Sequence, residues 1–246
     1  MKEFVLYQNE ELAPGYHRLV FEGQLGGVPG QFLMVKAWPT HDPLLARPFS
    51  LHEVEKERFS IFFQVRGRGT ALLAQLKPGD RASVLGPLGR GFPLNEKGPF
   101  ILVAGGIGIA PFKFLVKALK DEEIFLFYGA RRAKELLLLE EFQKLGIKVF
   151  PATEDGSVGF HGLVTRPLEE FLAQNASGTI YACGPNPMLE EVARIARAFK
   201  VKAYLSLEAR MACGLGLCLG CVIKGKGGRF LHLCTEGPVV PAERIF

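Results

Sequence analysis

The run Phe100-Ile-Leu-Val-Ala-Gly-Gly-Ile-Gly-Ile-Ala-Pro111 passes from an apolar stretch directly into a glycine-rich loop. A short apolar run that ends in glycines is typical of a strand buried on both faces of a parallel sheet. An apolar-periodic segment continues to about Lys120 and predicts a helix. Strand, glycine loop and helix in this order predict backbone N–H groups that face an anion. The loop does not match G-x-G-x-x-G, so the usual dinucleotide fingerprint is absent.

The chain after this loop alternates between strands and helices. We expect strands at 124–128, 147–152 and 179–183, and helices at 133–145, 167–174 and 187–199. This alternation is typical of a doubly wound α/β domain, a parallel sheet with helices on both faces. The domain is predicted to span residues 97–203.

The chain before the loop has a different pattern of apolar and polar residues. Short alternating runs at 16–21, 31–36, 59–65 and 81–85 are separated by glycine and proline. Such a series predicts a small antiparallel β-barrel over residues 1–96. One helix is expected inside it at 70–76, with either an N-cap at Thr70 or a phosphate site at the start Gly67-Arg-Gly-Thr70.

The last segment, residues 204–246, holds four of the five cysteines, spaced C-x4-C-x2-C-x12-C. This is the order of the cluster ligands in plant-type ferredoxins, with a shorter final gap. Four thiolates would ligate a [2Fe–2S] cluster; a structural zinc site is the alternative, although zinc knuckles usually carry two C-x2-C pairs. The segment has too little apolar content to fold alone, so a metal cluster would stabilise it. The four candidate metal ligands are Cys213, Cys218, Cys221 and Cys234.

Composition excludes several classes of protein. The net charge is +5 and the pI about 9.0, but Lys and Arg are dispersed and no basic run appears, which argues against nucleic-acid binding. The N-terminus has no apolar signal core, and no run approaches eighteen apolar residues. We therefore expect a cytoplasmic protein with no membrane segment, in which disulfides are disfavoured.

Three further motifs are weak individually. Arg47-Pro-Phe-Ser50 places a guanidinium and a hydroxyl at a strand end, where they would bind phosphate or a flavin ring. Cys183-Gly-Pro185 ends a predicted parallel strand, the edge at which open sheets bind ligands. A lone cysteine there is otherwise a small buried hydrophobe. The start Gly67-Arg-Gly-Thr70 is the third.

Together with the loop at 105–111, these motifs resemble those of the ferredoxin–NADP reductase superfamily. The resemblance covers residues 1 to about 203. It implies an FAD-binding barrel with an R-x-[YF]-S segment, and a nicotinamide dinucleotide domain with G-G-x-G-x-A-P and C-G-P. Phe49 stands where many members have Tyr, so the phenol hydrogen bond is lost. The implied FAD contacts are Arg47, Pro48, Phe49, Ser50, Gln64, Val65, Arg66, Gly69 and Thr70, and the implied NAD contacts are Gly105, Gly106, Gly108, Ala110, Pro111, Cys183, Gly184 and Pro185.

With the cysteine segment included, the whole chain resembles the electron-transfer subunits of type B dihydroorotate dehydrogenases. This resemblance implies FAD, a [2Fe–2S] cluster and NAD, and an FMN-containing catalytic partner in a heterotetramer of two plus two that serves pyrimidine biosynthesis. Electrons would pass from the partner through the cluster and FAD to NAD+. A related subunit that serves a sulfide dehydrogenase or hydrogenase is the alternative, but such relatives often carry a carboxylate at the position of Cys213.

The chemistry of the three expected cofactors also favours an electron-transfer chain. Nicotinamide exchanges two electrons and an iron–sulfur cluster one, so a flavin is needed between them. The three segments leave no room for an organic substrate. The five histidines are scattered, so no catalytic residue is predicted and each histidine is interpreted as a surface or packing residue. The choice between NAD and NADP stays open, because Thr153-Glu-Asp-Gly156 favours a ribose hydroxyl while Arg131 and Arg132 favour a 2′-phosphate.

Overall fold

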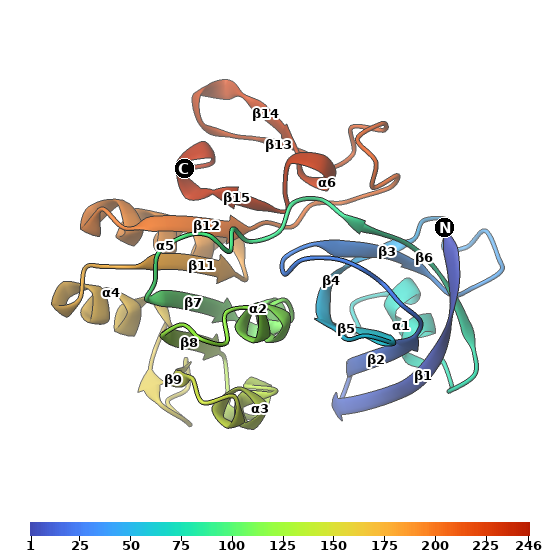
Figure 1. Ribbon diagram of the computed structural model, residues 1–246, viewed down its shortest axis with the longest axis horizontal. Helices are drawn as coiled ribbons and strands as arrows, with labels where there is room; N and C mark the ends of the chain where they lie inside the picture. The colour runs from blue at the N-terminus through green and yellow to red at the C-terminus, as the bar shows by residue number, and fades with distance from the viewer.

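The computed structural model describes residues 1–246, and the first part of the chain closes into an antiparallel barrel (Figure 1). The strand order is β1-β2-β5-β4-β3-β6, and apolar side chains such as Leu19, Leu33 and Ile61 fill the interior with no exposed surface. The barrel consists of β1 (Lys2–Ala13), β2 (Tyr16–Glu22), β3 (Phe32–Lys36), β4 (Arg47–Val54), β5 (Arg58–Gln64) and β6 (Arg81–Leu88), with α1 (Arg68–Ala74) between β5 and β6.

The second part is a sheet with strand order β10-β9-β8-β7-β11-β12-β15. All neighbouring strands are parallel except β12 and β15. The strands are β7 (Phe100–Gly105), β8 (Ile124–Ala130), β9 (Lys148–Thr153), β10 (Phe160–His161), β11 (Thr179–Cys183), β12 (Lys202–Ser206) and β15 (Val239–Pro241), and the helices are α2 (Phe112–Ala118), α3 (Leu139–Lys144), α4 (Thr165–Gln174) and α5 (Asn186–Phe199).

The alternation of side chains along β7 explains the layers. Ile101 and Val103 point to the face covered by α4 and α5, whereas Phe100 and Leu102 point to the face covered by α2 and α3 (Figure 1). A strand that is buried on both faces must be apolar throughout, as this one is. The barrel beside a doubly wound sheet confirms the predicted fold class.

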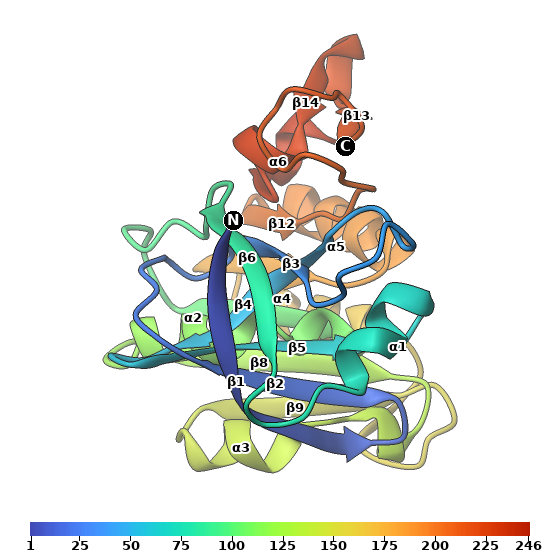
Figure 2. The ribbon, with the colours of Figure 1, turned by 90° about the vertical axis from the view of Figure 1, so that its right-hand side faces the viewer.

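The C-terminal part adds the hairpin β13 (Val222–Lys224) and β14 (Phe230–His232) and the short helix α6 (Leu233–Glu236), and ends in β15. Figure 2 shows the hairpin projecting beyond both the barrel and the sheet. Its base is buried, because Cys221 and Cys234 join the same apolar cluster as Phe32 and Met34 of the barrel. Strand β12 runs across the predicted boundary at 203/204, and β15 returns to pair with it, so the sheet continues into the last segment.

Several predicted elements are corrected. The helix predicted at 133–145 is instead a 3-10 turn, η2 (Ala133–Glu135), followed by α3, because Leu138 adopts a left-handed conformation with φ 63° between them. Helix α1 begins at Arg68 with Gly67 as N-cap, two residues before the predicted start. Thr70 is therefore not the N-cap. The sequence patterns also missed β1, β10, β12, β13, β14 and β15 as strands.

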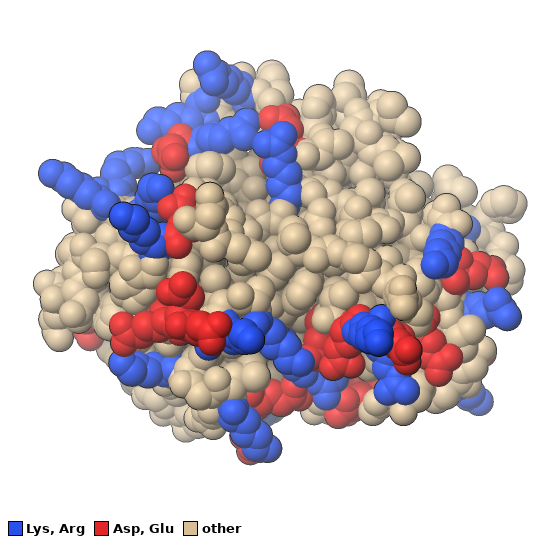
Figure 3. Space-filling view, in the orientation of Figure 1, with Lys and Arg blue, Asp and Glu red and all other residues tan.

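No helix is both long enough and apolar enough to span a membrane. Figure 3 shows Lys and Arg gathered at the upper left, over the C-terminal hairpin and the nearby edge of the sheet. A belt of mixed charge crosses the lower part of the same face. The centre of the face, above this belt, carries almost no charged side chains.

Candidate functional site

The predicted nucleotide loop and the Cys183-Gly-Pro185 turn lie against each other at the carboxyl ends of β7 and β11, which are neighbours in the sheet. A Cβ placed on Gly108 would lie 2.1 Å from the carbonyl oxygen of Cys183, and one on Gly105 would lie 2.8 Å from Cδ of Pro185. Both distances are far below van der Waals contact. Glycine is therefore required at these two positions so that the loop and the turn can pack together.

Gly106 differs from the other two glycines of the loop. It has φ +53°, and nothing lies within 4 Å of the position of its missing Cβ. The loop itself forms a 3-10 turn, η1 (Gly106–Ile109), which Ala110 and Pro111 connect to α2. The open side of Gly106 is thus where a pyrophosphate would approach the backbone, whereas Gly105 and Gly108 serve protein packing.

The predicted flavin residues come from β4, the end of β5 and α1. Gly69 sits directly against Arg47: a Cβ on Gly69 would be 2.8 Å from the guanidinium Nε. The Thr70 hydroxyl accepts hydrogen bonds from the backbone N–H groups of Arg66 and Gly67, at 2.9 and 3.1 Å. The contact of Gly69 with Arg47 brings the motifs at 47–50 and 67–70 together. The hydroxyl of Thr70 faces the backbone just before α1.

A flavin ring would fit the outer part of β4. Residues 47–50 are all half-exposed, and the next two residues of the strand are buried. Phe49 packs on Phe63 with ring centroids 5.1 Å apart and stays half-exposed, so its ring could also contact a flat aromatic ligand. The remaining predicted residues occupy the surrounding backbone: Pro48 and Ser50 in β4, Gln64 at the end of β5, and Val65 directly after it.

Every cysteine sulfur of the C-terminal segment receives a backbone N–H. Leu215 donates to Cys213 at 3.3 Å and Gly220 to Cys218 at 3.5 Å. Gly216 donates to Cys234 at 3.1 Å, and the N–H of Cys234 donates to Cys221 at 3.4 Å. Such N–H···S contacts stabilise thiolates, and therefore suit a cluster that binds thiolate ligands.

The four sulfurs lie near one another: Cys213 lies beside Cys218, and Cys234 lies beside Cys221 and is also affected by the charge of Cys213. The N–H groups of Leu215 and its neighbours lower the pKa of Cys213 to about 6, whereas burial raises the pKa of Cys234 to about 11. Four thiolates that each accept a backbone N–H suit the ligand set of a [2Fe–2S] cluster.

One buried histidine joins the two halves of the site. The Nδ1–H of His52, two residues after Ser50, donates to the carbonyl of Ala110 at 2.6 Å. Sequence reasoning treated His52 as an ordinary surface or packing residue. Only its place in a strand next to a flavin motif could have drawn attention to it, since the partner is 58 residues away.

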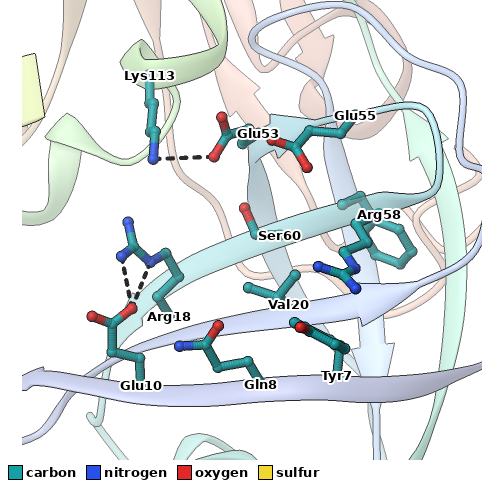
Figure 4. Close-up of a pocket in the computed structure, with 11 residues that line it drawn as sticks. Tyr7, Gln8, Glu10, Arg18, Val20, Glu53, Glu55, Arg58, Ser60 and Lys113 are labelled. Carbon is teal, nitrogen blue, oxygen red and sulfur yellow. Dashed lines mark hydrogen bonds and ion pairs between the residues drawn. The ribbon is translucent and has the colours of Figure 1, made fainter.

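A charged pocket of about 360 Å³ lies beside this junction, on the outer wall of the barrel (Figure 4). Lys113 of α2 reaches Glu53 of β4 at 3.1 Å and Glu141 of α3 at 2.7 Å. Arg18 of β2 contacts Glu141 at 2.8 Å and Glu10 at 2.7 Å. None of the predicted site residues lines the pocket. Of its cations, Lys113 and Arg18 are paired with carboxylates, while Arg58 lies over the ring of Tyr7. The pocket is therefore an ion-pair network that ties the barrel to α2 and α3.

The open question of NAD or NADP falls on two adjacent loops. The backbone N–H of Glu154 donates to the carbonyl of Ala130, and that of Asp155 to the carbonyl of Arg131, so the two loops lie side by side at the ends of β8 and β9. Ser157 donates to Asp155 through its hydroxyl and its N–H, which lowers the pKa of that carboxyl. An ionised carboxylate at this edge disfavours a 2′-phosphate.

Comparison with known families gives two matches along the chain. Residues 208–246 match the iron–sulfur cluster binding domain of dihydroorotate dehydrogenase B, and residues 102–194 match an oxidoreductase NAD-binding domain. The first match covers all four cysteines of the cluster segment, and the second covers the nucleotide loop and the Cys183 turn.

Full-length relatives agree with these matches. The dihydroorotate dehydrogenase B (NAD(+)) electron transfer subunit of Caldanaerobacter subterraneus subsp. tengcongensis is 40% identical, over 100% of this chain and 98% of the relative. The subunit of the same name from Clostridium acetobutylicum is 36% identical, over 95% and 92%.

Solved structures show the same fold. A chain of the NADH-dependent reduced ferredoxin–NADP oxidoreductase, which carries out flavin-based electron bifurcation, superposes with a TM-score of 0.88 at 26% identity, over 100% of this chain and 90% of that one. A ferredoxin–NADP+ reductase from Neisseria gonorrhoeae with bound FAD and NADP superposes with a TM-score of 0.67 at 15% identity, over 80% and 91%.

Proposed function

Because the chain belongs to the family of dihydroorotate dehydrogenase B electron transfer subunits, we propose that it passes electrons from a catalytic partner chain to NAD+ in pyrimidine biosynthesis. The cofactors of this proposal are FAD on the barrel, NAD at the sheet and a [2Fe–2S] cluster on the C-terminal segment. In this proposal the oxidation of dihydroorotate takes place on the partner chain.

The observation that carries the proposal is that the cysteine segment contacts both of the other parts of the chain. A Cβ on Gly214 would lie 3.0 Å from Met34 of β3 and 2.9 Å from Leu88 of β6, so this loop touches the barrel. The same segment ends in β15, which pairs with the nucleotide sheet. One chain thus holds the three candidate sites side by side, as a relay requires.

Each group of candidate residues has a separate role in this proposal. FAD would supply the exchange between two-electron and one-electron transfer. Arg47 would bind a flavin phosphate, while Phe49 and Ser50 would hold the ring. The open face of Gly106 would admit the dinucleotide phosphates, with Gly105 and Gly108 keeping the loop flat against the Cys183 turn. The N–H groups on the four cysteine sulfurs would stabilise the charge of the cluster and raise its potential.

The partner would dock on the cluster loop. Residues 211–223 contain no charged side chain, and Leu215, Leu217 and Leu219 are 50, 79 and 59% exposed. Leucines exposed on both sides of the ligand Cys218 suit a protein surface that covers the cluster during electron transfer. An FMN-containing catalytic chain in a complex of two plus two subunits in the cytoplasm is the assembly that we propose.

The test is to reconstitute the complex with Cys218→Ser. This variant should lose the transfer of electrons from dihydroorotate to NAD+ while it keeps the reduction of a dye by NADH, because only the first reaction passes through the cluster. The dye reaction is the internal control for folding and flavin content. Dihydroorotate–NAD+ activity that survives in the variant would show that the cluster is not on the path.

A further inference from the structure

His52 occupies the contact between the barrel and the nucleotide loop. Its side chain is fully buried, and its ring packs against Phe62 at 5.6 Å. Nδ1 makes one hydrogen bond, 2.6 Å long, to the carbonyl of Ala110. Nε2 is one of only two buried side-chain polar atoms that have no hydrogen-bond partner.

The ring is neutral at pH 7, because burial lowers the pKa of His52 to about 4. Lys113 and Arg18 lower the pKa further, while the bond to Ala110 and the charge of Glu53 raise it. A neutral ring acts here through its N–H and not through charge. A leucine would fill the same space without burying an unpaired Nε2, so the hydrogen bond to Ala110 is what distinguishes histidine at this position.

This bond connects the two candidate binding elements. His52 lies two residues after Ser50 on β4, and Ala110 is the residue that joins η1 to α2. The N–H of Ala110 is already bonded to Ile107 inside η1, at 3.0 Å. With the carbonyl held by the barrel, the peptide groups on both sides of Ala110 are fixed, and with them the direction of the loop.

We propose that His52 is a positioning residue whose Nδ1–H bond to Ala110 sets the nucleotide loop relative to the flavin-binding strand. The inference rests on the proposed function in one respect, namely that residues 105–111 bind the dinucleotide. The ring of His52 has no exposed surface, so the role proposed here is not direct contact with a ligand. His52 acts only through the loop.

The chain offers matched variants to test this role. In His52→Asn the side-chain N–H₂ is the same number of bonds from Cα as Nδ1, so the bond to Ala110 can form. In His52→Leu the volume is similar, but the donor is lost. His17→Leu is the control: His17 is also buried and bonds to Asn9 at 2.9 Å, but both residues lie in the barrel.

Two readouts on the flavin-loaded chain are independent of turnover. The first is the dissociation constant of NAD+ by calorimetry, and the second is amide hydrogen exchange over residues 105–113. His52→Leu should bind NAD+ about tenfold more weakly, the effect of one lost buried hydrogen bond, with faster exchange in the loop and an unchanged flavin spectrum. His52→Asn and His17→Leu should keep the wild-type values in both readouts.

The inference is wrong if His52→Leu leaves the exchange of the loop unchanged, or if His52→Asn is as impaired as His52→Leu. Should His52→Leu fail to fold, His52→Met replaces it, because its flexible side chain is of similar volume and also lacks a donor. Failure of the proposed function would look different: the wild-type chain itself would not bind NAD+, and the exchange readout would still decide the role of His52.

Discussion

Two glycine-rich loops of this chain use glycine for opposite reasons. In the nucleotide loop, Gly105 and Gly108 leave room for the neighbouring turn, so the loop is fixed by close packing. In the cluster loop, Gly214 and Gly216 have φ of +70° and +80°, and the N–H of Gly216 points at a cysteine sulfur. The first loop is shaped by the protein around it, whereas the second is shaped for an inorganic centre.

The difference extends to the surroundings of each loop. The nucleotide loop is enclosed by β11, α2 and the barrel, and Ile109 has no exposed surface. The cluster loop exposes three leucines, Leu215, Leu217 and Leu219. We therefore expect the first loop to be ordered without any ligand and the second to depend on its cluster.

Removal of iron should give the largest difference between the two loops in their rates of hydrogen exchange. A chelator applied to the reduced protein removes the cluster, and the amides of Leu215, Gly216 and Gly220 then lose the sulfur geometry that holds them. Their hydrogen exchange should accelerate by about 100-fold or more, as expected for a segment that opens locally. The amides of 105–111 should exchange as before and are the control within the same molecule. Equal acceleration in both loops would remove the distinction.

Gly108→Ala should give the largest effect of a single substitution on the packed loop. Its Cβ would meet the carbonyl of Cys183 at 2.1 Å, and a backbone carbonyl cannot move aside cheaply. We expect a loss of about 3 kcal/mol in the free energy of unfolding, the upper end of the cost of overpacking, measured by denaturant titration. NADH–dye activity should be lost as well.

Gly106→Ala is the matched control, since nothing lies within 4 Å of its Cβ and only the strain of φ +53° remains. That strain costs about 1 kcal/mol. The packing account fails if Gly106→Ala destabilises the protein as much as Gly108→Ala.

Acid should destabilise the protein by a smaller amount, through the ion pairs of Glu53 with α2. Burial tends to raise the pKa of Glu53, but hydrogen bonds from Lys117 and Lys113 and their charges outweigh it and hold the pKa below the usual 4.5. A carboxyl whose pKa is depressed in the folded state stabilises the fold above pH 4.5, and this stability is lost as the pH falls through the folded-state pKa.

Thermal unfolding of Glu53→Gln at several pH values tests this ion pair. The melting temperature of the variant should be lower than that of the wild type by about 2–4 °C at pH 7, as for a loss near 1 kcal/mol, and the difference should shrink below pH 4. A constant difference at all pH values would mean that the charge of Glu53 does not hold α2.

The sequence was enough to predict the barrel and the parallel sheet, because each depends on local pattern. The apolar run 100–104 is an example. The four cysteine ligands were predicted in the same way, from their spacing, and stay a prediction. The sequence was not enough for β15, whose partner β12 lies about 35 residues earlier in the chain, or for the break at Leu138 within a run of leucines. Between η2 and α3 the chain buries Leu136 and then starts a new helix at Leu139. Leucine favours helix at every one of these positions, so helix propensity does not predict where the helix is interrupted.

The candidate site shows the same limit. Arg47, Phe49 and the loop at 105–111 were predicted from motifs, and their assignment to FAD and NAD stays a prediction. The contact of Gly69 with Arg47 and the bond of His52 to Ala110 connect positions 22 and 58 residues apart, and no local pattern announces them.

The measurement that tests the central claim most directly is the visible spectrum of anaerobically purified protein, before and after dithionite, with iron, zinc and acid-labile sulfide assayed on the same sample. We expect flavin absorbance near 450 nm, further absorbance above 500 nm that dithionite bleaches, and about two irons and two sulfides per chain. About one zinc per chain, with no iron and no absorbance above 500 nm, would contradict the account, because the cysteine loop could then pass no electrons.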